Sequence, residues 1–295
     1  MRYKVFFKKR LGQFYMLIAI LLGSLTTSIV KTLASYNASV LEITFIRNVG
    51  TLIMCLLIIK KDQYKLLTLN KNVFKHFGHA FFALLAMLSY FKSYMILSLA
   101  DATAISFLTP VFIAAISAIL FRRQINFSIW FSITLGIVGV LMMINLEHMP
   151  LMSGIVFGCL ASLFGAIALI ILKELRKSQG TNEINLIYMC MSLSLLIPFV
   201  YKDLSVLSKE SIYILLILGI GGIAEQFFLV ESFNYSPVYV LAPLGYTSII
   251  WNSILGFIIW REVPDLSTIY ASCFIILSSV LILFYNISEE QNEKH

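Results

Sequence analysis

The sequence contains few charged residues for its length. Of 295 residues only 13% are Asp, Glu, Lys or Arg, whereas 59% are hydrophobic, and the mean hydropathy is +0.90. Soluble domains are about 25% charged, so this composition excludes an ordinary soluble globular protein. Apolar runs of about 20 residues recur along the chain, and each is long enough to cross a hydrocarbon core of roughly 30 Å. We therefore predict an all-α polytopic membrane protein.

Cysteine is also scarce, and the chain lacks the usual motifs of metal and catalytic sites. The four cysteines stand singly in apolar segments without a CxxC pair, so neither a disulfide framework nor a cysteine metal site is indicated. Phosphate loops, nucleophile elbows and clusters of metal ligands are missing as well. We expect no enzyme activity, no cofactor and no metal. The net charge of +7 is explained by basic loops of a membrane protein, so we expect no nucleic-acid partner.

Ten apolar segments separated by mostly short loops predict ten transmembrane helices. None of the loops is long enough to fold as a separate domain. The predicted helices lie at residues 12–34, 40–60, 74–97, 101–121, 127–145, 151–173, 182–201, 210–233, 237–260 and 266–286.

The distribution of basic residues predicts the orientation of these helices. Most of the 22 Lys and Arg residues fall in loops that share one side if the N-terminus is cytoplasmic. Because Lys and Arg accumulate on the cytoplasmic side of membrane proteins, both termini are predicted to be cytoplasmic. We place the protein in the cell inner membrane as a multi-pass protein, with its oligomeric state left open.

The two halves of the chain resemble each other. Lys31 and Glu42 precede an apolar span in the first half, and Lys173 and Glu183 match them at nearly the same spacing in the second. Five spans per half make the second copy enter the membrane upside down, as in inverted-repeat transporters. The predicted repeats comprise residues 1–146 and 147–295.

Each half also carries a proline inside a predicted span. Pro110 lies in the fourth span and Pro243 in the ninth. Proline removes a helical hydrogen bond and kinks the helix, so we predict hinge or kink points at both positions. Pairs of small residues, such as Gly136 and Gly139 or Gly154 and Gly158, favour close helix packing and are interpreted as structural.

Charged residues within the spans are the first candidates for a substrate site. Glu225 lies near the middle of its span, and a charge at that depth costs about 2.5–3.5 kcal/mol on insertion scales. Arg47 and Lys92 are its natural partners, and all three are predicted to contact substrate. The alternative is a purely structural ion pair with a neighbouring helix. Lys31, near the outer end of its span, is interpreted as reaching water by snorkelling.

Aromatic residues on the same spans are the second group of candidates. An aromatic wall suits a flat heterocycle or a cation held over a ring face. The alternative is that these rings face lipid or pack between helices. We predict an amphipathic, cationic small-molecule substrate that stacks on Tyr94, Phe228, Tyr239 and Tyr246.

Three short motifs carry a resemblance to a known family. They are Phe45-Ile46-Arg47 in the second span, Thr109-Pro110-Val111-Phe112 in the fourth, and Trp260-Arg261-Glu262 at the end of the ninth. Together with two halves of five spans, they resemble the drug/metabolite transporter superfamily with two EamA-type domains. The sequence departs from the family after the fourth span, where Arg122-Arg123 replaces the glutamate. The resemblance implies secondary transport by alternating access, with the substrate held between the repeats.

Within that superfamily, two stretches are similar to the S-adenosylmethionine uptake transporters of intracellular bacteria. These are Ala242-Pro243-Leu244-Gly245-Tyr246 and the residues that follow Trp260. This resemblance implies import of S-adenosylmethionine in exchange for S-adenosylhomocysteine. One alternative is an exporter of amino acids or drugs on the same fold, and another is an intramembrane enzyme or a structural membrane partner.

Overall fold

The computed structural model of the chain describes residues 2–58, 72–120, 127–142, 149–200, 209–235 and 241–292, and every regular element in these ranges is a helix. This confirms the prediction of an all-helical protein. The first half contains α1 (Arg2–Ser35), α2 (Val40–Ile58), α3 (Val73–Ile96), α4 (Leu99–Ser106), α5 (Thr109–Leu120) and α6 (Phe127–Met142). The second half contains α7 (Met149–Leu175), α8 (Thr181–Val200), α9 (Lys209–Tyr235), the 3₁₀ helix η2 (Ala242–Thr247), α11 (Ser248–Trp260) and α12 (Leu266–Asn292).

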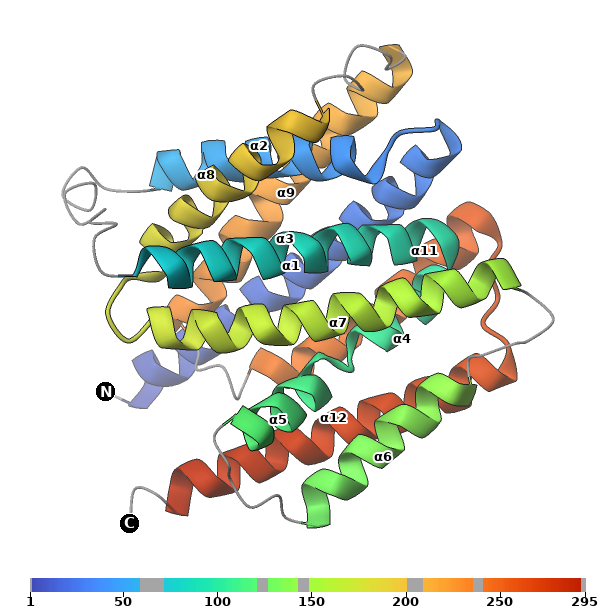
Figure 1. Cartoon of the computed structure of the whole chain (residues 1–295). Helices are drawn as coiled ribbons and strands as arrows, with labels where there is room; N and C mark the ends of the chain where they lie inside the picture. Colours follow the sequence, from blue (N-terminus) through green and yellow to red (C-terminus); the bar gives the residue numbers. More distant parts are fainter. Residues whose placement is uncertain are drawn as a thin grey trace.

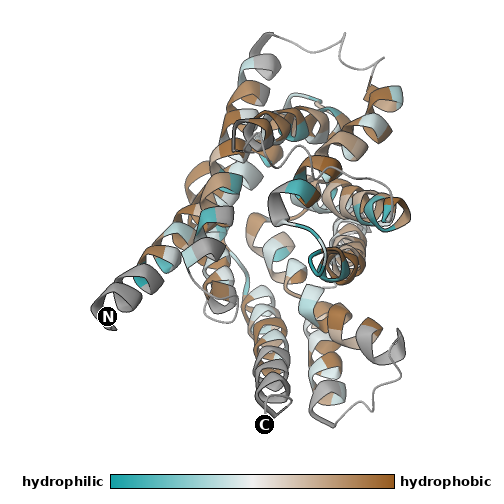
Figure 2. Ribbon diagram, turned by 90° about the vertical axis from the view of Figure 1, so that its left-hand side faces the viewer, coloured by the Kyte–Doolittle hydropathy of each residue, from teal (hydrophilic) through white to brown (hydrophobic). Residues whose placement is uncertain are grey.

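The outer surface of the bundle is apolar. Large hydrophobic side chains remain exposed, among them Phe199, Ile220 and Ile258, and hydrophobic residues recur along the helices (Figure 2). A soluble monomer rarely exposes apolar patches on this scale. Five of the described helical segments are long and apolar enough to cross a membrane, and shorter apolar helices accompany them. The architecture is that of a multi-pass membrane protein.

The two halves pack against each other in a reciprocal way. The closest helix pairs are α3 with α7 and α1 with α9, which are the same contact with the halves exchanged. The contacts of α2 with α9 and of α3 with α8 exchange in the same manner. Helices α6 and α12 lie side by side and run in opposite directions, and the start of α1 lies at the same end of the bundle as the end of α12 (Figure 1). The most extensive helix contacts of each half are therefore made with the other half.

The two proline-containing spans depart from a regular α-helix in different ways. The fourth predicted span divides at Phe107 and Leu108 into α4 and α5, with Pro110 as the second residue of α5. In the described part of the ninth, Pro243 lies within the 3₁₀ helix η2, which continues directly into α11. The predicted kink is therefore a helix break beside Pro110 and a 3₁₀ stretch at Pro243. The two irregular stretches touch, because the rings of Phe107 and Tyr246 meet edge to face at 5.0 Å.

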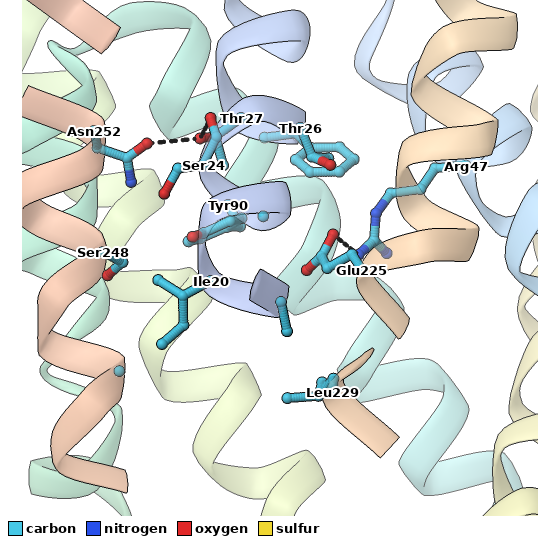
Figure 3. Close-up of a pocket in the computed structure, with 14 residues that line it drawn as sticks. Ile20, Ser24, Thr26, Thr27, Arg47, Tyr90, Glu225, Leu229, Ser248 and Asn252 are labelled. Carbon is cyan, nitrogen blue, oxygen red and sulfur yellow. Dashed lines mark hydrogen bonds and ion pairs between the residues drawn. The ribbon is translucent and has the colours of Figure 1, made fainter. Parts of the chain in front are cut away.

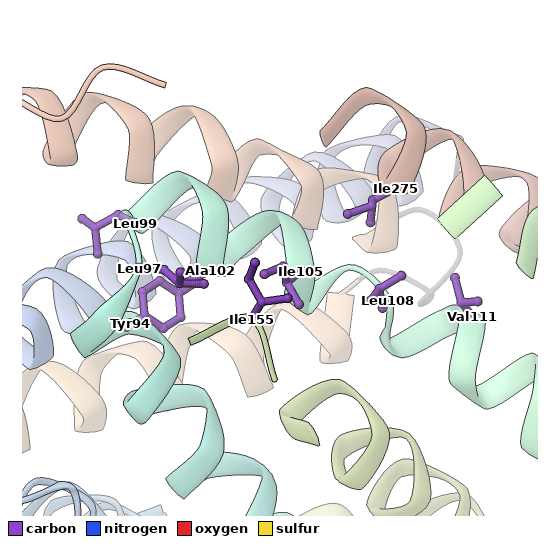
Figure 4. Close-up of a cluster of buried hydrophobic side chains, with 9 residues drawn as sticks. All are labelled: Tyr94, Leu97, Leu99, Ala102, Ile105, Leu108, Val111, Ile155 and Ile275. Carbon is purple, nitrogen blue, oxygen red and sulfur yellow. The ribbon is translucent and has the colours of Figure 1, made fainter. Parts of the chain in front are cut away.

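Hydroxyl groups of neighbouring helices bond to backbone carbonyls at the first break. Ser162 on α7 donates a hydrogen bond to the carbonyl of Ile105 at 3.0 Å, and Ser279 on α12 donates one to the carbonyl of Phe107. An unpaired backbone group is costly in hydrocarbon, so irregular backbone needs protein partners of this kind. The break is also enclosed by a buried apolar cluster from α3, α4, α5, α7 and α12 (Figure 4). Its members are Tyr94, Leu97, Leu99, Ala102, Ile105, Leu108, Val111, Ile155 and Ile275.

An ion pair joins the two halves near the last turns of α1. Lys31 pairs with Glu262, which follows α11, and also donates to the carbonyl of Leu97 at 2.7 Å. The Glu262 carboxylate accepts from the backbone N–H of Leu99 at 3.2 Å. The expectation that Lys31 snorkels to water is therefore wrong: the side chain is only 13% exposed because Glu262 and the end of α3 hold it inside the bundle.

Glycines allow the closest helix contacts, as predicted for Gly139 and Gly154. A Cβ atom added to Gly139 would lie 2.6 Å from Ile275 Cγ1, and one at Gly154 would lie 2.7 Å from Leu97 Cγ. A further contact of this kind joins α2 to α9, where a Cβ on Gly50 would lie 2.6 Å from the Gly219 carbonyl oxygen. That neighbour is backbone, so it cannot rotate away.

Replacing Gly50 by alanine is expected to force α2 and α9 apart. Overpacking of this kind costs about 1–3 kcal/mol, and thermal unfolding of the purified protein in detergent measures the loss. The matched control is Gly165→Ala, where the nearest atoms to an added Cβ are 3.9 Å away. Equal melting temperatures for the two variants would contradict the proposed close contact.

Breaking the Lys31–Glu262 pair is expected to destabilise the protein more than breaking an exposed pair. Because both side chains are largely buried, at 13% and 23% exposure, Lys31→Met or Glu262→Gln should cost about 2–4 kcal/mol by leaving one charge unpaired. The double variant should lose less than the sum of the two. The exposed Lys177–Glu174 pair is the control, since Glu174→Gln should leave the melting temperature nearly unchanged.

Candidate functional site

A cavity of about 210 Å³ lies where the two halves of the chain meet. The first half lines it from α1, α2 and α3, and the second half lines it from α9, η2 and α11. Inverted-repeat transporters hold their substrates at such an interface between repeats. The polar side chains of the lining are Ser24, Thr26, Thr27, Arg47, Tyr90, Glu225, Ser248 and Asn252 (Figure 3).

Arg47 and Glu225 form an ion pair in the wall of the cavity. Arg47 Nη2 on α2 lies 3.2 Å from Glu225 Oε2 on α9, and the side chains are 17% and 22% exposed. Pairing lowers the cost of keeping each charge in the membrane. Glycine provides the space: a Cβ on Gly23 would lie 3.3 Å from Glu225 Oε1, and one on Gly222 would lie 3.2 Å from Arg47 Cγ. Larger residues would crowd both charged side chains.

Several polar atoms around this pair lack a partner within the protein. In the part of the chain that the structure describes, Arg47 Nε, Ser24 Oγ and Thr26 Oγ1 are buried and make no hydrogen bond. Buried polar groups are nearly always hydrogen-bonded, because leaving one unpaired costs about 1–3 kcal/mol. All three residues line the cavity. The wall of the cavity therefore contains polar groups that are not satisfied in this conformation.

A chain of hydrogen bonds leads from the cavity into the packed interior. Tyr90 meets Tyr94 at 2.9 Å, and Tyr94 meets Thr103 on α4 at 2.8 Å. The Asn252 amide of α11 donates to Thr103 at 2.7 Å and accepts from Thr27 of α1 at 3.0 Å. The chain thus connects α3, α4, α11 and α1, and both of its ends line the cavity.

The structure brings together two of the residues predicted for the site and separates the others. Arg47 and Glu225 lie in the cavity wall as a pair. Tyr94 is fully buried behind Tyr90, so the expectation that its ring offers a face to substrate is wrong for this conformation. Lys92 is exposed on α3 and stands outside the described lining, so Arg47 and not Lys92 is the partner of Glu225.

The other predicted aromatic residues do not form a wall of the cavity. The ring of Phe228 packs on Tyr15 at 5.7 Å, and Tyr246 packs on Phe107 across the helix breaks. Neither residue belongs to the lining that the structure describes. These rings pack between helices, which agrees with the alternative interpretation of the aromatic residues. The predicted contact at Tyr239 lies outside the described residues.

Sequence reasoning missed the uncharged polar residues of the cavity. Ser24, Thr26 and Thr27 belong to one hydroxyl-rich stretch of an otherwise apolar span, and Asn252 is the sole amide side chain of α11. Polar residues in transmembrane segments commonly bond across helices, so both features were available as signals. Both signals are weak, because serine and threonine often bond to the backbone of their own helix instead.

Comparison with known proteins places the chain among transporters. An uncharacterized transporter of Helicobacter pylori is 29% identical over 92% of this chain and 94% of its own length. A pseudopaline exporter of Pseudomonas aeruginosa is 25% identical over 88% of this chain and 93% of its own. An S-adenosylmethionine uptake transporter of Rickettsia prowazekii is 22% identical over 75% of each chain. The predicted likeness to the S-adenosylmethionine transporters is thus confirmed at low identity, whereas the substrate of this chain stays a prediction.

A solved crystal structure supports the fold independently. It superposes with a TM-score of 0.59 over 92% of this chain and 96% of its own, at 14% identity, which is a likeness of fold alone. The model of the EamA-like transporter family matches residues 10–145 and again residues 152–284. The two matches agree with the reciprocal packing of the two halves and confirm the resemblance found in the motifs. The chain belongs to the EamA-like transporter family.

Proposed function

We propose that this protein is a secondary transporter that moves a small metabolite across the cell inner membrane by alternating access, and that it is not an enzyme. The observation that carries the proposal is the cavity between the halves, which holds the Arg47–Glu225 pair and three buried polar atoms in need of partners. In the proposed topology ten spans cross the membrane as two inverted repeats, and both termini are cytoplasmic. The basic loops support this orientation.

The proposed substrate is a small metabolite with a positively charged group. Glu225 supplies the negative charge, and Arg47 positions it through their ion pair. S-adenosylmethionine is the first candidate, taken up in exchange for S-adenosylhomocysteine, and a relative at 22% identity is a transporter of that molecule. Export of an amino-acid-like or drug-like molecule is the second candidate, supported by the pseudopaline exporter at 25% identity.

We further propose how the cavity changes access. The break beside Pro110 and the 3₁₀ stretch that contains Pro243 are the proposed hinges, because both depart from regular α-helical hydrogen bonding and they touch each other through Phe107 and Tyr246. The Lys31–Glu262 pair closes the end of the bundle opposite the start of α1. It must separate for that end to open.

The first test is counterflow in liposomes with labelled S-adenosylmethionine outside and S-adenosylhomocysteine trapped inside. Wild-type protein is expected to accumulate label, whereas Glu225→Gln should reduce the rate at least tenfold by removing the charge that faces the ligand. Glu174→Gln is the control, because Glu174 is an exposed acid at the end of α7 and lies in an exposed ion pair.

The possible outcomes test the identity of the substrate and the role of Glu225 separately. Absence of flux in folded protein would reject S-adenosylmethionine and direct the assay to export from inside-out vesicles. Flux that is equal in Glu225→Gln and wild type would keep the substrate and assign Glu225 a structural role.

A further inference from the structure

Tyr90 lines the cavity from α3, and the hydrogen bonds around its hydroxyl group determine where the proton of that hydroxyl lies. The direction of hydrogen-bond donation is determined at Thr103, whose hydroxyl carries a single proton. Thr103 Oγ1 lies 2.6 Å from the carbonyl oxygen of Leu99, which can only accept, so Thr103 donates there. Toward every other neighbour Thr103 is an acceptor.

The remaining links follow from the one proton on each hydroxyl group. Tyr94 lies 2.8 Å from Thr103 and must donate to it, because the Thr103 proton is already used. Tyr94 then has no second proton for its contact with Tyr90 at 2.9 Å, so Tyr90 donates to Tyr94. The result is unchanged if the Thr103 proton points to Asn252 instead, since Thr103 still accepts from Tyr94. Tyr94 and Thr103 are positioning residues that act through Tyr90.

Tyr90 therefore presents only lone pairs to the cavity. Glu225 adds a second acceptor, because Arg47 holds Oε2 and leaves Oε1 on the side of Gly23. Both residues line the same cavity, from α3 and α9 respectively (Figure 3). A cation with N–H groups would satisfy both acceptors, whereas a cation without N–H groups would supply charge and leave the hydrogen bonds unmade.

We infer that this site recognises its ligand through a protonated amine and discriminates against cations that lack an N–H, such as quaternary ammonium and sulfonium centres. The inference deepens the proposed transport function and rests on the same cavity. For a ligand with both a sulfonium and an amino group, the amino group occupies the Tyr90–Glu225 side. A cavity of about 210 Å³ accommodates such a head group with its adjoining carbons.

Ligand-dependent thermal stabilisation of the purified full chain tests the discrimination. The probes are phenethylamine, tyramine and histamine, each compared with its N,N,N-trimethyl derivative. At least one primary amine is expected to raise the melting temperature and to bind about ten- to a hundredfold more tightly than its trimethyl partner, as expected for losing a charge-assisted hydrogen bond. Tyr90→Phe should remove most of this preference, and Tyr270→Phe, at an exposed position on α12, should keep it.

Infrared spectroscopy tests the proton direction without any ligand. The C–O stretching band of a tyrosine differs between a hydroxyl that only donates and one that also accepts. The difference spectrum between wild type and Tyr90→Phe is expected to show a donor-only band for Tyr90. Tyr94→Phe should shift that band, since the Tyr90 proton loses its acceptor, and Thr103→Val serves if Tyr94→Phe does not fold.

Each result decides a separate claim. Failure of all the primary amines to stabilise the protein, or equal stabilisation by the trimethyl derivatives, would overturn the inference. So would a Tyr90 band typical of an acceptor in the ligand-free protein. Loss of S-adenosylmethionine counterflow with the amine preference intact would reject the transported substrate and leave the recognition rule standing.

Discussion

The cost of charge inside a membrane is the constraint on which the interior of this protein depends. Arg47 and Glu225 neutralise each other across α2 and α9, and Lys31 and Glu262 do so across α1 and the end of α11. Each pair joins one half of the chain to the other. The charges therefore cannot be satisfied unless both halves fold together, and the interface between the halves becomes the polar part of an apolar molecule.

Irregular helix geometry at corresponding spans of the two halves is the second feature of the interior. The fourth span breaks beside Pro110, the ninth is a 3₁₀ helix at Pro243, and the two stretches meet through Phe107 and Tyr246. Hydroxyl groups on α7 and α12 bond to carbonyls at the first break. A broken helix supported in this way can bend without exposing backbone polar groups to lipid.

The hydrogen bonds around the cavity have a defined direction of donation. Thr27, Asn252, Thr103, Tyr94 and Tyr90 form a continuous chain through four helices. Because each hydroxyl has one proton, the chain ends in an acceptor at the cavity surface. Hydrogen bonds behind the cavity wall thereby determine which atoms Tyr90 can offer to a ligand.

The sequence by itself determined the helical membrane class and the two related halves, and it drew attention to Pro110, Pro243, Glu225 and Arg47. These follow from composition, the length of the apolar runs and the cost of charge in hydrocarbon, all of which are local properties of the chain. The tertiary structure alone decided that Glu225 pairs with Arg47 and that Lys31 is held by Glu262, and it placed Phe228, Tyr246 and Lys92 outside the described cavity lining. It also revealed Ser24, Thr26 and Asn252. Which face of a helix meets which partner depends on side chains distant in sequence, and apolar segments with weak periodicity do not encode that choice locally.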